Sequence, residues 1–156
     1  MAHVHRYEAN LTWTGAAKGP TTDYKSYSRE YTVSFPGKPS YQGSADATFR
    51  GDPGLYNPED LLVASLSACH LLAYLAICAR GGVKVLHYED RADGQMEMKD
   101  GHIRFTRVTL RPRVVIDRSS EPGLARDMHR QAHAECFIAN SVNFPVDHEA
   151  EIVTAE

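Results

Sequence analysis

The sequence predicts an α+β fold in which antiparallel sheets pack around a long, buried central helix and a second helix. Three observations predict it: strand-like alternation near the N-terminus, one apolar helical run after residue 57, and two extended runs joined by Asp100-Gly101. The chain of 156 residues has no internal repeat and no linker-like stretch. We therefore expect a single domain over residues 1–156.

The N-terminal part predicts three strands. Apolar or aromatic side chains alternate over residues 5–13 and again over residues 27–35, which is the period of a strand. A third, short strand is expected over residues 41–47. Glycine and proline predict the connections, namely a loop at 15–20, a turn at 36–39 and a loop at 50–56.

A helix is predicted to begin at Asn57-Pro58-Glu59-Asp60 and to end at Gly81-Gly82. Asn57 can cap free backbone N–H groups, Pro58 suits the first helical position, and two acids favour the positive end of the helix dipole. From Leu61 to Ala79 the helix is apolar on nearly every face.

A helix this apolar raises the possibility of a membrane span, which we reject. Ser65, Ser67 and His70 interrupt the run, and the rest of the chain is polar. A helix that is apolar all round is buried in protein, and so small a domain can hardly wrap it alone. A second subunit is the simplest cover, so we expect a homodimer.

The C-terminal half predicts a hairpin, a helix and a strand. Two extended runs cover roughly residues 83–98 and 102–117, and Pro112 in the second predicts an edge position. A helix opens at residues 119–122, with apolar side chains at helical spacing after it, and a short segment at 136–142 continues or restarts it. A last short strand is expected over residues 144–153.

Composition excludes several classes of function. The hydrophobic share of 42%, the charged share of 24% and the net charge of -3 are those of a soluble globular protein without a basic face, so a nucleic-acid partner is not expected. Residues 1–10 are polar and do not resemble a signal peptide. Three cysteines form no disulfide framework, so the cytosol is the expected compartment.

Cys69 and Cys136 are the residues most able to carry chemistry. A thiolate can attack a peroxide oxygen and become a sulfenic acid, and a second thiol can then condense with it to a disulfide. The other interpretation of Cys69 is a small buried core residue, and for Cys78, in the same apolar run, that interpretation is clearly preferred.

A zinc site is the competing hypothesis. His129, His133 and Cys136 would share one helical face, and Cys69 or His70 could supply a fourth ligand. Surface histidines on an amphipathic helix are the preferred explanation of this spacing. The remaining histidines, His148 among them, form no recognisable cluster in the sequence.

The helix motif Asn57-Pro58-Glu59-Asp60-Leu61-Leu62, followed by Ser67-Ala68-Cys69, resembles the signature of the OsmC/Ohr family of organic hydroperoxide reductases. The distant Cys136 matches the two-cysteine plan of that family, and the loop Phe49-Arg50-Gly51-Asp52-Pro53-Gly54 resembles its OsmC branch. The resemblance spans nearly the whole chain. It implies an OsmC-like fold in which two chains form an intertwined homodimer with long central helices.

The resemblance also implies a thiol peroxidase that reduces organic hydroperoxides and needs no cofactor or metal. Carried over, Cys69 is the peroxidatic cysteine, Cys136 the resolving cysteine and Glu59 the assisting glutamate. Arg50 is the expected assisting arginine and Arg29 the alternative. A dithiol reductant, possibly of the lipoyl type, is implied as partner, and Phe137 stands where family members often have proline.

The proposed reaction of Cys69 requires a positive group close to its sulfur, and an arginine is suited to that role. A thiol with a pKa of about 8.5 is mostly protonated at neutral pH, and burial raises that pKa further. An arginine stays charged and could stabilise the Cys69 thiolate, while Glu59 could hold the arginine by a bidentate pair. Two further hypotheses are a zinc- or ligand-binding dimeric stress protein without turnover, and a non-catalytic stress protein in which Cys69 is inert.

Overall fold

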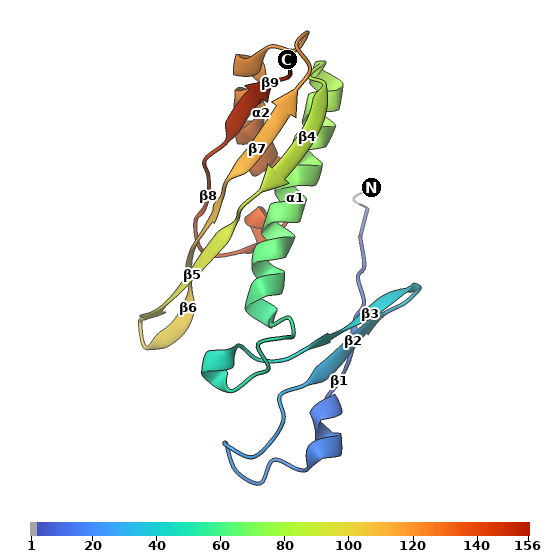
Figure 1. The fold of residues 1–156 in the computed structure, drawn as a ribbon, viewed down its shortest axis with the longest axis vertical. Coiled ribbons are helices and arrows are strands. Elements are labelled where there is room, and N and C mark those ends of the chain that lie inside the picture. Colours follow the sequence, from blue (N-terminus) through green and yellow to red (C-terminus); the bar gives the residue numbers. More distant parts are fainter. Residues whose placement is uncertain (1–2) are drawn as a thin grey trace. The chain divides into compact units, whose positions relative to one another are not determined.

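The computed structural model describes residues 3–156 and contains two compact units. The N-terminal unit extends to Leu61, and the C-terminal unit comprises Leu62–Glu156. The long helix α1, Pro58–Gly81, begins in the first unit and lies mostly in the second. The C-terminal unit therefore contains both helices, apart from the first turn of α1, and all the strands of two sheets (Figure 1).

The N-terminal unit holds one antiparallel sheet of three strands. They are β1 (Asn10–Thr12), β2 (Tyr31–Phe35) and β3 (Lys38–Gly43). The three predicted strands are present, but β1 and β2 are shorter at their N-terminal ends than the alternation suggested. The third covers residues 38–43 rather than the predicted 41–47, so it takes in part of the turn predicted at 36–39. The stretch Thr14–Lys18, expected to be a loop, is a 3₁₀ helix.

Helix α1 begins and ends where the sequence predicted. Asn57 and Asp60 cap the helix reciprocally, since the Asp60 amide donates to Asn57 Oδ1 at 2.8 Å and the Asn57 amide donates to Asp60 Oδ2 at 3.4 Å. The chain leaves the helix through Gly82, whose φ of 78° is in the left-handed region that favours glycine.

The C-terminal unit contains two mixed sheets of three strands each, in the orders β4-β7-β9 and β5-β6-β8. The strands are β4 (Val85–Asp90), β5 (Asp93–Lys99), β6 (His102–Leu110), β7 (Pro112–Ile116), β8 (Val146–His148) and β9 (Glu151–Thr154). The predicted hairpin at Asp100-Gly101 is confirmed, and both residues have positive φ. Each predicted long run, and the predicted last strand, is divided into two strands.

Two sheet predictions need correction. Pro112 does not mark an edge, because β7 lies between β4 and β9. Proline is tolerated there because it is the first residue of the strand, where little of the ladder depends on its missing N–H. The sheets are also not purely antiparallel, since β8 and β9 pair in parallel with β6 and β7.

Helix α2, Pro122–Glu135, packs against α1 within the C-terminal unit. The Glu121 carboxylate caps it by accepting hydrogen bonds from the Gly123 and Leu124 amides. The buried core between the helices and the β4-β7-β9 sheet consists of Tyr74, Ile77, Cys78, Val83, Val114, Ile116, Ala125, Met128 and Ala132. A smaller core formed by Leu66, Val108, Leu110 and Val146 lies nearer the N-terminal end of α1.

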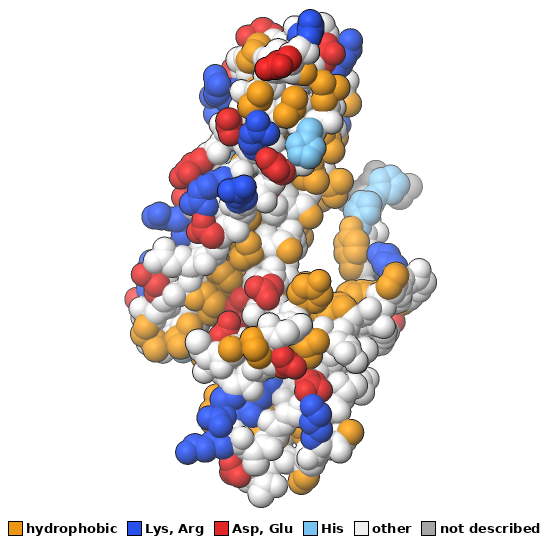
Figure 2. Space-filling model, in the orientation of Figure 1, with side chains coloured by type: hydrophobic (Ala, Val, Ile, Leu, Met, Phe, Trp, Pro, Cys, Tyr) orange, Lys and Arg blue, Asp and Glu red, His pale blue; other side chains and the backbone are white. Residues whose placement is uncertain are grey.

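One face of α1 is apolar and exposed in the single chain. Its exposed residues from Ala64 onward are Ala64, Ala68, Leu72, Leu75, Ala76, Ala79, Arg80 and Gly81. Hydrophobic side chains gather along this helix on the face shown in Figure 2. By length and composition α1 could cross a membrane, a test that core helices of soluble proteins also pass, and only 28% of its most apolar window is buried. We call Ala64, Ala68, Leu72, Leu75, Ala76 and Ala79 the α1 stripe.

Candidate functional site

The structure brings Cys69 and Cys136 together. Cys69 lies on α1 and is partly exposed, whereas Cys136 is the C-terminal cap of α2 and is only 1% exposed. Burial, together with hydrogen bonding and negative charge from the Cys69 side chain, raises the pKa of the Cys136 thiol to about 11. The two thiols lie close enough for this hydrogen bond, and such proximity is what intramolecular disulfide formation requires.

The turn after α2 fixes the position of Cys136. The Ala139 amide donates to Cys136 Sγ at 3.4 Å, a contact that lowers the pKa of the thiol and partly opposes burial. The Asn140 side chain donates to the carbonyl oxygens of Ala134 and Cys136, both at 2.9 Å. The segment predicted over residues 136–142 is therefore a tight turn with a short 3₁₀ helix, Ala139–Ser141, that presents the thiol.

Cys78 belongs to the core, as its position in the apolar run suggested. It is 1% exposed and packs with Tyr74 in the larger core. Burial raises the pKa of the Cys78 thiol, so the protonated, unreactive form is favoured.

Glu59 and the two candidate arginines belong to the N-terminal unit. Glu59 and Arg29 line one cavity of about 460 Å³, together with the aromatic side chains of Trp13, Tyr27, Tyr31 and Phe49. The Arg29 guanidinium lies 3.8 Å from the centre of the Tyr27 ring and donates to the Tyr27 carbonyl, so its orientation is fixed.

Arg50 lies outside the lining of that cavity. It has a φ of 67°, in the left-handed region, and lines a neighbouring cavity of about 350 Å³ that Arg29 also lines. Arg29, and not Arg50, therefore lines the cavity that Glu59 lines, whereas the sequence resemblance favoured Arg50 as the assisting arginine.

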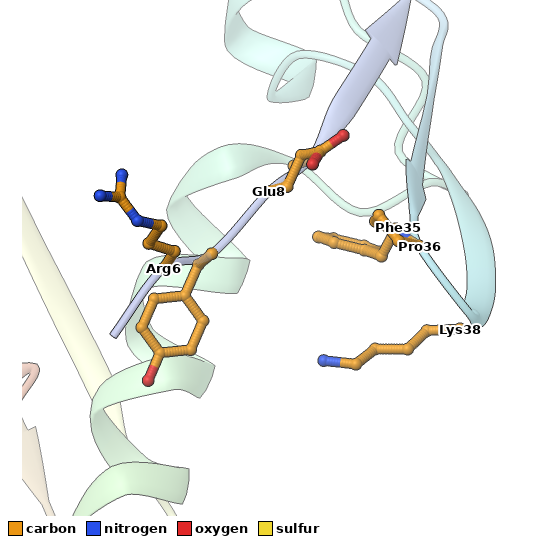
Figure 3. A pocket seen from close by; sticks show the side chains of 7 residues that line it. Arg6, Glu8, Phe35, Pro36 and Lys38 are labelled. Atoms are coloured by element: carbon orange, nitrogen blue, oxygen red, sulfur yellow. The ribbon is translucent and has the colours of Figure 1, made fainter. Parts of the chain in front are cut away.

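A further cavity of the N-terminal unit lies between the extended residues 6–9 and the turn after β2 (Figure 3). Its labelled side chains are Arg6, Glu8, Phe35, Pro36 and Lys38. None of these is a nucleophile or a titratable group in the neutral range, so we assign this cavity no chemistry.

A cluster of four histidines lies at the contact between α1 and α2, and the sequence revealed only part of it. His70 Nε2 and His129 Nδ1 are 3.0 Å apart, and the ring centre of His148, on β8, lies 5.5 Å from that of His70 and 5.9 Å from that of His129. His133 completes the cluster at 5.9 Å from His148. The four-residue spacing of His129 and His133 was visible in the sequence, but His148 was wrongly thought to stand apart.

Burial keeps the two inner histidines neutral. The pKa of His70 is lowered to about 4 and that of His129 to about 3, in both cases mainly by loss of solvation. His129 also stacks on Tyr74, with 3.8 Å between ring centres, and Tyr74 Oη donates to the Ala125 carbonyl at 3.1 Å. The inner pair, His70 and His129, is thus packed between the two helices.

Within residues 3–156, no group of three or more histidine, cysteine, aspartate or glutamate side chains is arranged to hold a metal ion. The alternative zinc site at His129, His133 and Cys136, with Cys69 or His70 as fourth ligand, is therefore not assembled in this structure.

Comparison with known proteins agrees with the fold. The model of the family described as OsmC-like protein matches residues 51–151. An OsmC-like protein of unknown function from Vibrio cholerae is 35% identical, with a TM-score of 0.86 over 94% of this chain and 99% of that one. The uncharacterized protein YmaD of Bacillus subtilis is 20% identical over 98 residues, which cover 61% of this chain and 65% of that protein.

Organic hydroperoxide resistance proteins share the fold at lower identity. The protein from Elizabethkingia anophelis is 17% identical, with a TM-score of 0.72 over 99% of this chain and 100% of that one. OhrB of Bacillus subtilis is 18% identical, with a TM-score of 0.62 over 94% of this chain and 98% of that one. The match of the family model, together with the likeness to the Vibrio cholerae protein, shows that this chain belongs to the OsmC-like family.

Proposed function

We propose that this protein is a thiol peroxidase that reduces organic hydroperoxides, with Cys69 as the peroxidatic cysteine and Cys136 as the resolving cysteine. The observation that carries the proposal is the partly exposed Cys69 thiol beside the buried Cys136 thiol. Membership of a family whose structural neighbours include organic hydroperoxide resistance proteins supports a role in peroxide stress.

The proposed reaction has two steps. The Cys69 thiolate attacks the distal oxygen of the hydroperoxide, the O–O bond breaks, and the leaving alkoxide takes up a proton to become an alcohol. The resulting sulfenic acid on Cys69 is then attacked by Cys136, which forms the disulfide and releases water. A dithiol reductant would return both cysteines to thiols.

An arginine is proposed to favour the thiolate form of Cys69. Arg50 is the residue that the family resemblance selects, and Arg29 is the alternative that shares a cavity with Glu59. On α1 itself, Glu59 and Cys69 are separated by about 15 Å of helical rise, so Glu59 acts on the arginine rather than on the thiol. Measuring kcat/KM after alanine substitution at each arginine decides between them.

Mass spectrometry after one equivalent of cumene hydroperoxide tests the proposal. We expect a loss of two hydrogens and a single crosslinked peptide pair containing Cys69 and Cys136. In a Cys136→Ser variant we expect a stable sulfenic acid on Cys69, trapped by dimedone, after one equivalent of peroxide is consumed. If Cys69 stayed unmodified in both the wild-type protein and the Cys136→Ser variant, the proposed peroxidase activity would be ruled out.

We also propose that the protein is a homodimer in which the α1 stripe is covered by the second subunit. Leu72 is 67% exposed at the middle of this stripe, and an exposed apolar helix face in a soluble protein marks an interaction surface. Burying it on a symmetry-related copy would remove the same apolar surface from water on both chains.

Leu72→Glu is therefore expected to weaken the dimer at least tenfold, since it places a charge in an apolar contact. Sedimentation equilibrium of both proteins measures the change. The control is Leu86→Glu on β4, because Leu86 is also exposed, at 58%, but lies outside the α1 stripe. A wild-type monomer, or a dimer indifferent to Leu72→Glu, would rule out this surface.

A further inference from the structure

Helix α2 ends at Cys136, and the end of a helix tends to fray. The last four carbonyl groups of a helix have no partner within it, so they have to be bound by other groups. Here the Asn140 side chain binds the carbonyl oxygens of Ala134 and Cys136, donating to both at 2.9 Å. The Asn140 backbone amide also donates to the Cys136 carbonyl, at 3.0 Å. One exposed residue therefore ties the end of α2 to the turn that follows it.

The same turn is also attached to α1. Ile138 and Ala139 pack against the smaller core, to which α1 contributes Leu66. Leu66 precedes Cys69 by three residues, so the two side chains are neighbours on the surface of the helix. The turn therefore bridges the end of α2 and the part of α1 that carries Cys69.

The turn places backbone amides at the sulfur of Cys136. The Ala139 amide donates to Cys136 Sγ at 3.4 Å. Burial raises the pKa of this thiol, and the amides of Ala139 and Ile138 oppose that rise by hydrogen bonding. An amide N–H stabilises a thiolate more than a thiol, because the acceptor is then charged. The shape of the turn thus fixes the sulfur and favours the thiolate, which is the attacking form.

We propose that Asn140 is the positioning residue of the resolving cysteine, an inference that rests on the proposed function. It keeps the turn in the shape that holds Cys136 Sγ beside Cys69 and the Ala139 amide on that sulfur. In the closing step Cys136 gives up its proton and its sulfur attacks Cys69 Sγ. The S–S bond forms as the S–O bond breaks, and the departing hydroxide and the proton form water. The Asn140 hydrogen bonds go to backbone oxygens and not to either sulfur, so it acts only through Cys136.

Asn140→Ala tests the proposal, because it removes both side-chain donors at an exposed position and leaves the core intact. Rapid-quench mass spectrometry after one equivalent of cumene hydroperoxide follows the two steps separately. We expect Cys69 oxidation at the wild-type rate and disulfide closure about tenfold slower, with the sulfenic acid accumulating, because the turn is then less ordered. Asn140→Asp keeps the shape of the side chain but cannot donate at neutral pH, so closure should be at least as slow in that variant.

Equilibration with a dithiothreitol redox buffer measures the positioning without peroxide. In the wild-type protein the turn is ordered before the disulfide forms, so closing it orders few further residues. Without the Asn140 side chain the disulfide itself has to order the turn. We then expect the equilibrium constant for closure to fall about tenfold, which raises the reduction potential by about 30 mV for this two-electron couple. A merely structural residue would change the stability of the dithiol and disulfide forms alike and leave this potential unchanged.

Asn143→Ala is the matched control, because Asn143 is also an exposed asparagine, three residues farther along the chain, and takes no part in the hydrogen bonds of the turn. Its closure rate and its potential should be those of the wild type. An unchanged potential in Asn140→Ala, or an equal shift in Asn143→Ala, would overturn the proposal. If the wild-type protein does not react with hydroperoxides, the proposed peroxidase fails, and the potentials still decide the role of Asn140.

Discussion

Replacing Cys69 by serine should abolish hydroperoxide reduction. A serine hydroxyl in the same place is not ionised at neutral pH and has no sulfur to oxidise, so the first step of the reaction is lost. We expect the turnover number with cumene hydroperoxide and a dithiol to fall by at least about 10³-fold, to the rate of the uncatalysed mixture. A coupled assay of dithiol consumption measures this.

Cys78→Ser is the matched control for that experiment. Cys78 lies on the same helix but is buried in the core, where burial raises the pKa of its thiol. Turnover in this variant should stay within about twofold of wild type at a temperature where the protein is folded, even though a buried hydroxyl costs roughly 1–3 kcal/mol of stability. If Cys69→Ser kept its activity and Cys78→Ser lost it, the assignment of the nucleophile would be wrong.

Much of the fold could be predicted because local signals and packing agree. The Asn57 cap, the apolar run and Gly82 place both ends of α1, and Asp100-Gly101 places a hairpin that the positive φ values confirm. The strand breaks at Arg91 and Arg111 were missed, because an extended run looks the same whether it stays in one sheet or passes into another. The prediction of an edge strand from Pro112 was wrong for a related reason. The sequence does not show where a strand begins, so it could not show that Pro112 is the first residue of β7.

The candidate site was only partly accessible from the sequence. Two cysteines far apart in sequence become neighbours only when α1 packs on α2, and the family motif supplied that pairing where spacing alone could not. His148 shows the limit most clearly. It lies on a short strand near the C-terminus, joins His70, His129 and His133 through parallel pairing of β8 with β6, and no local pattern connects it to them.

Acidification should destabilise the protein well above the range in which carboxylates protonate. In the folded state the pKa of His70 is about 4 and that of His129 about 3, whereas an unfolded histidine titrates near 6.5. Below pH 6.5 the unfolded chain therefore binds protons that the folded chain does not. The stability contributed by neutral burial is complete above pH 6.5 and is lost as the pH falls towards the folded pKa values.

Between pH 7.5 and pH 5.0 we expect the free energy of unfolding to fall by about 2–4 kcal/mol, at about 1.4 kcal/mol per pH unit for each histidine. The lower figure applies if one proton is shared across the 3.0 Å contact between the two rings, since an imidazolium can donate to a neutral neighbour. Urea denaturation at fixed protein concentration, followed by circular dichroism, measures the change and keeps any subunit association constant.

Variants locate this effect at the buried pair. His129→Gln should be less stable than wild type at pH 7.5, because it disturbs the stack on Tyr74. On acidification its free energy of unfolding should fall by less than that of the wild type, because one of the two buried histidines that bind a proton on unfolding is gone. His87→Gln, at an exposed position, should keep the wild-type slope. An unfolding free energy that stays level from pH 7.5 to 5.0 in the wild-type protein would mean that the two imidazoles accept protons freely in the folded state. The conclusion that His70 and His129 are buried in their neutral form between α1 and α2 would then be wrong.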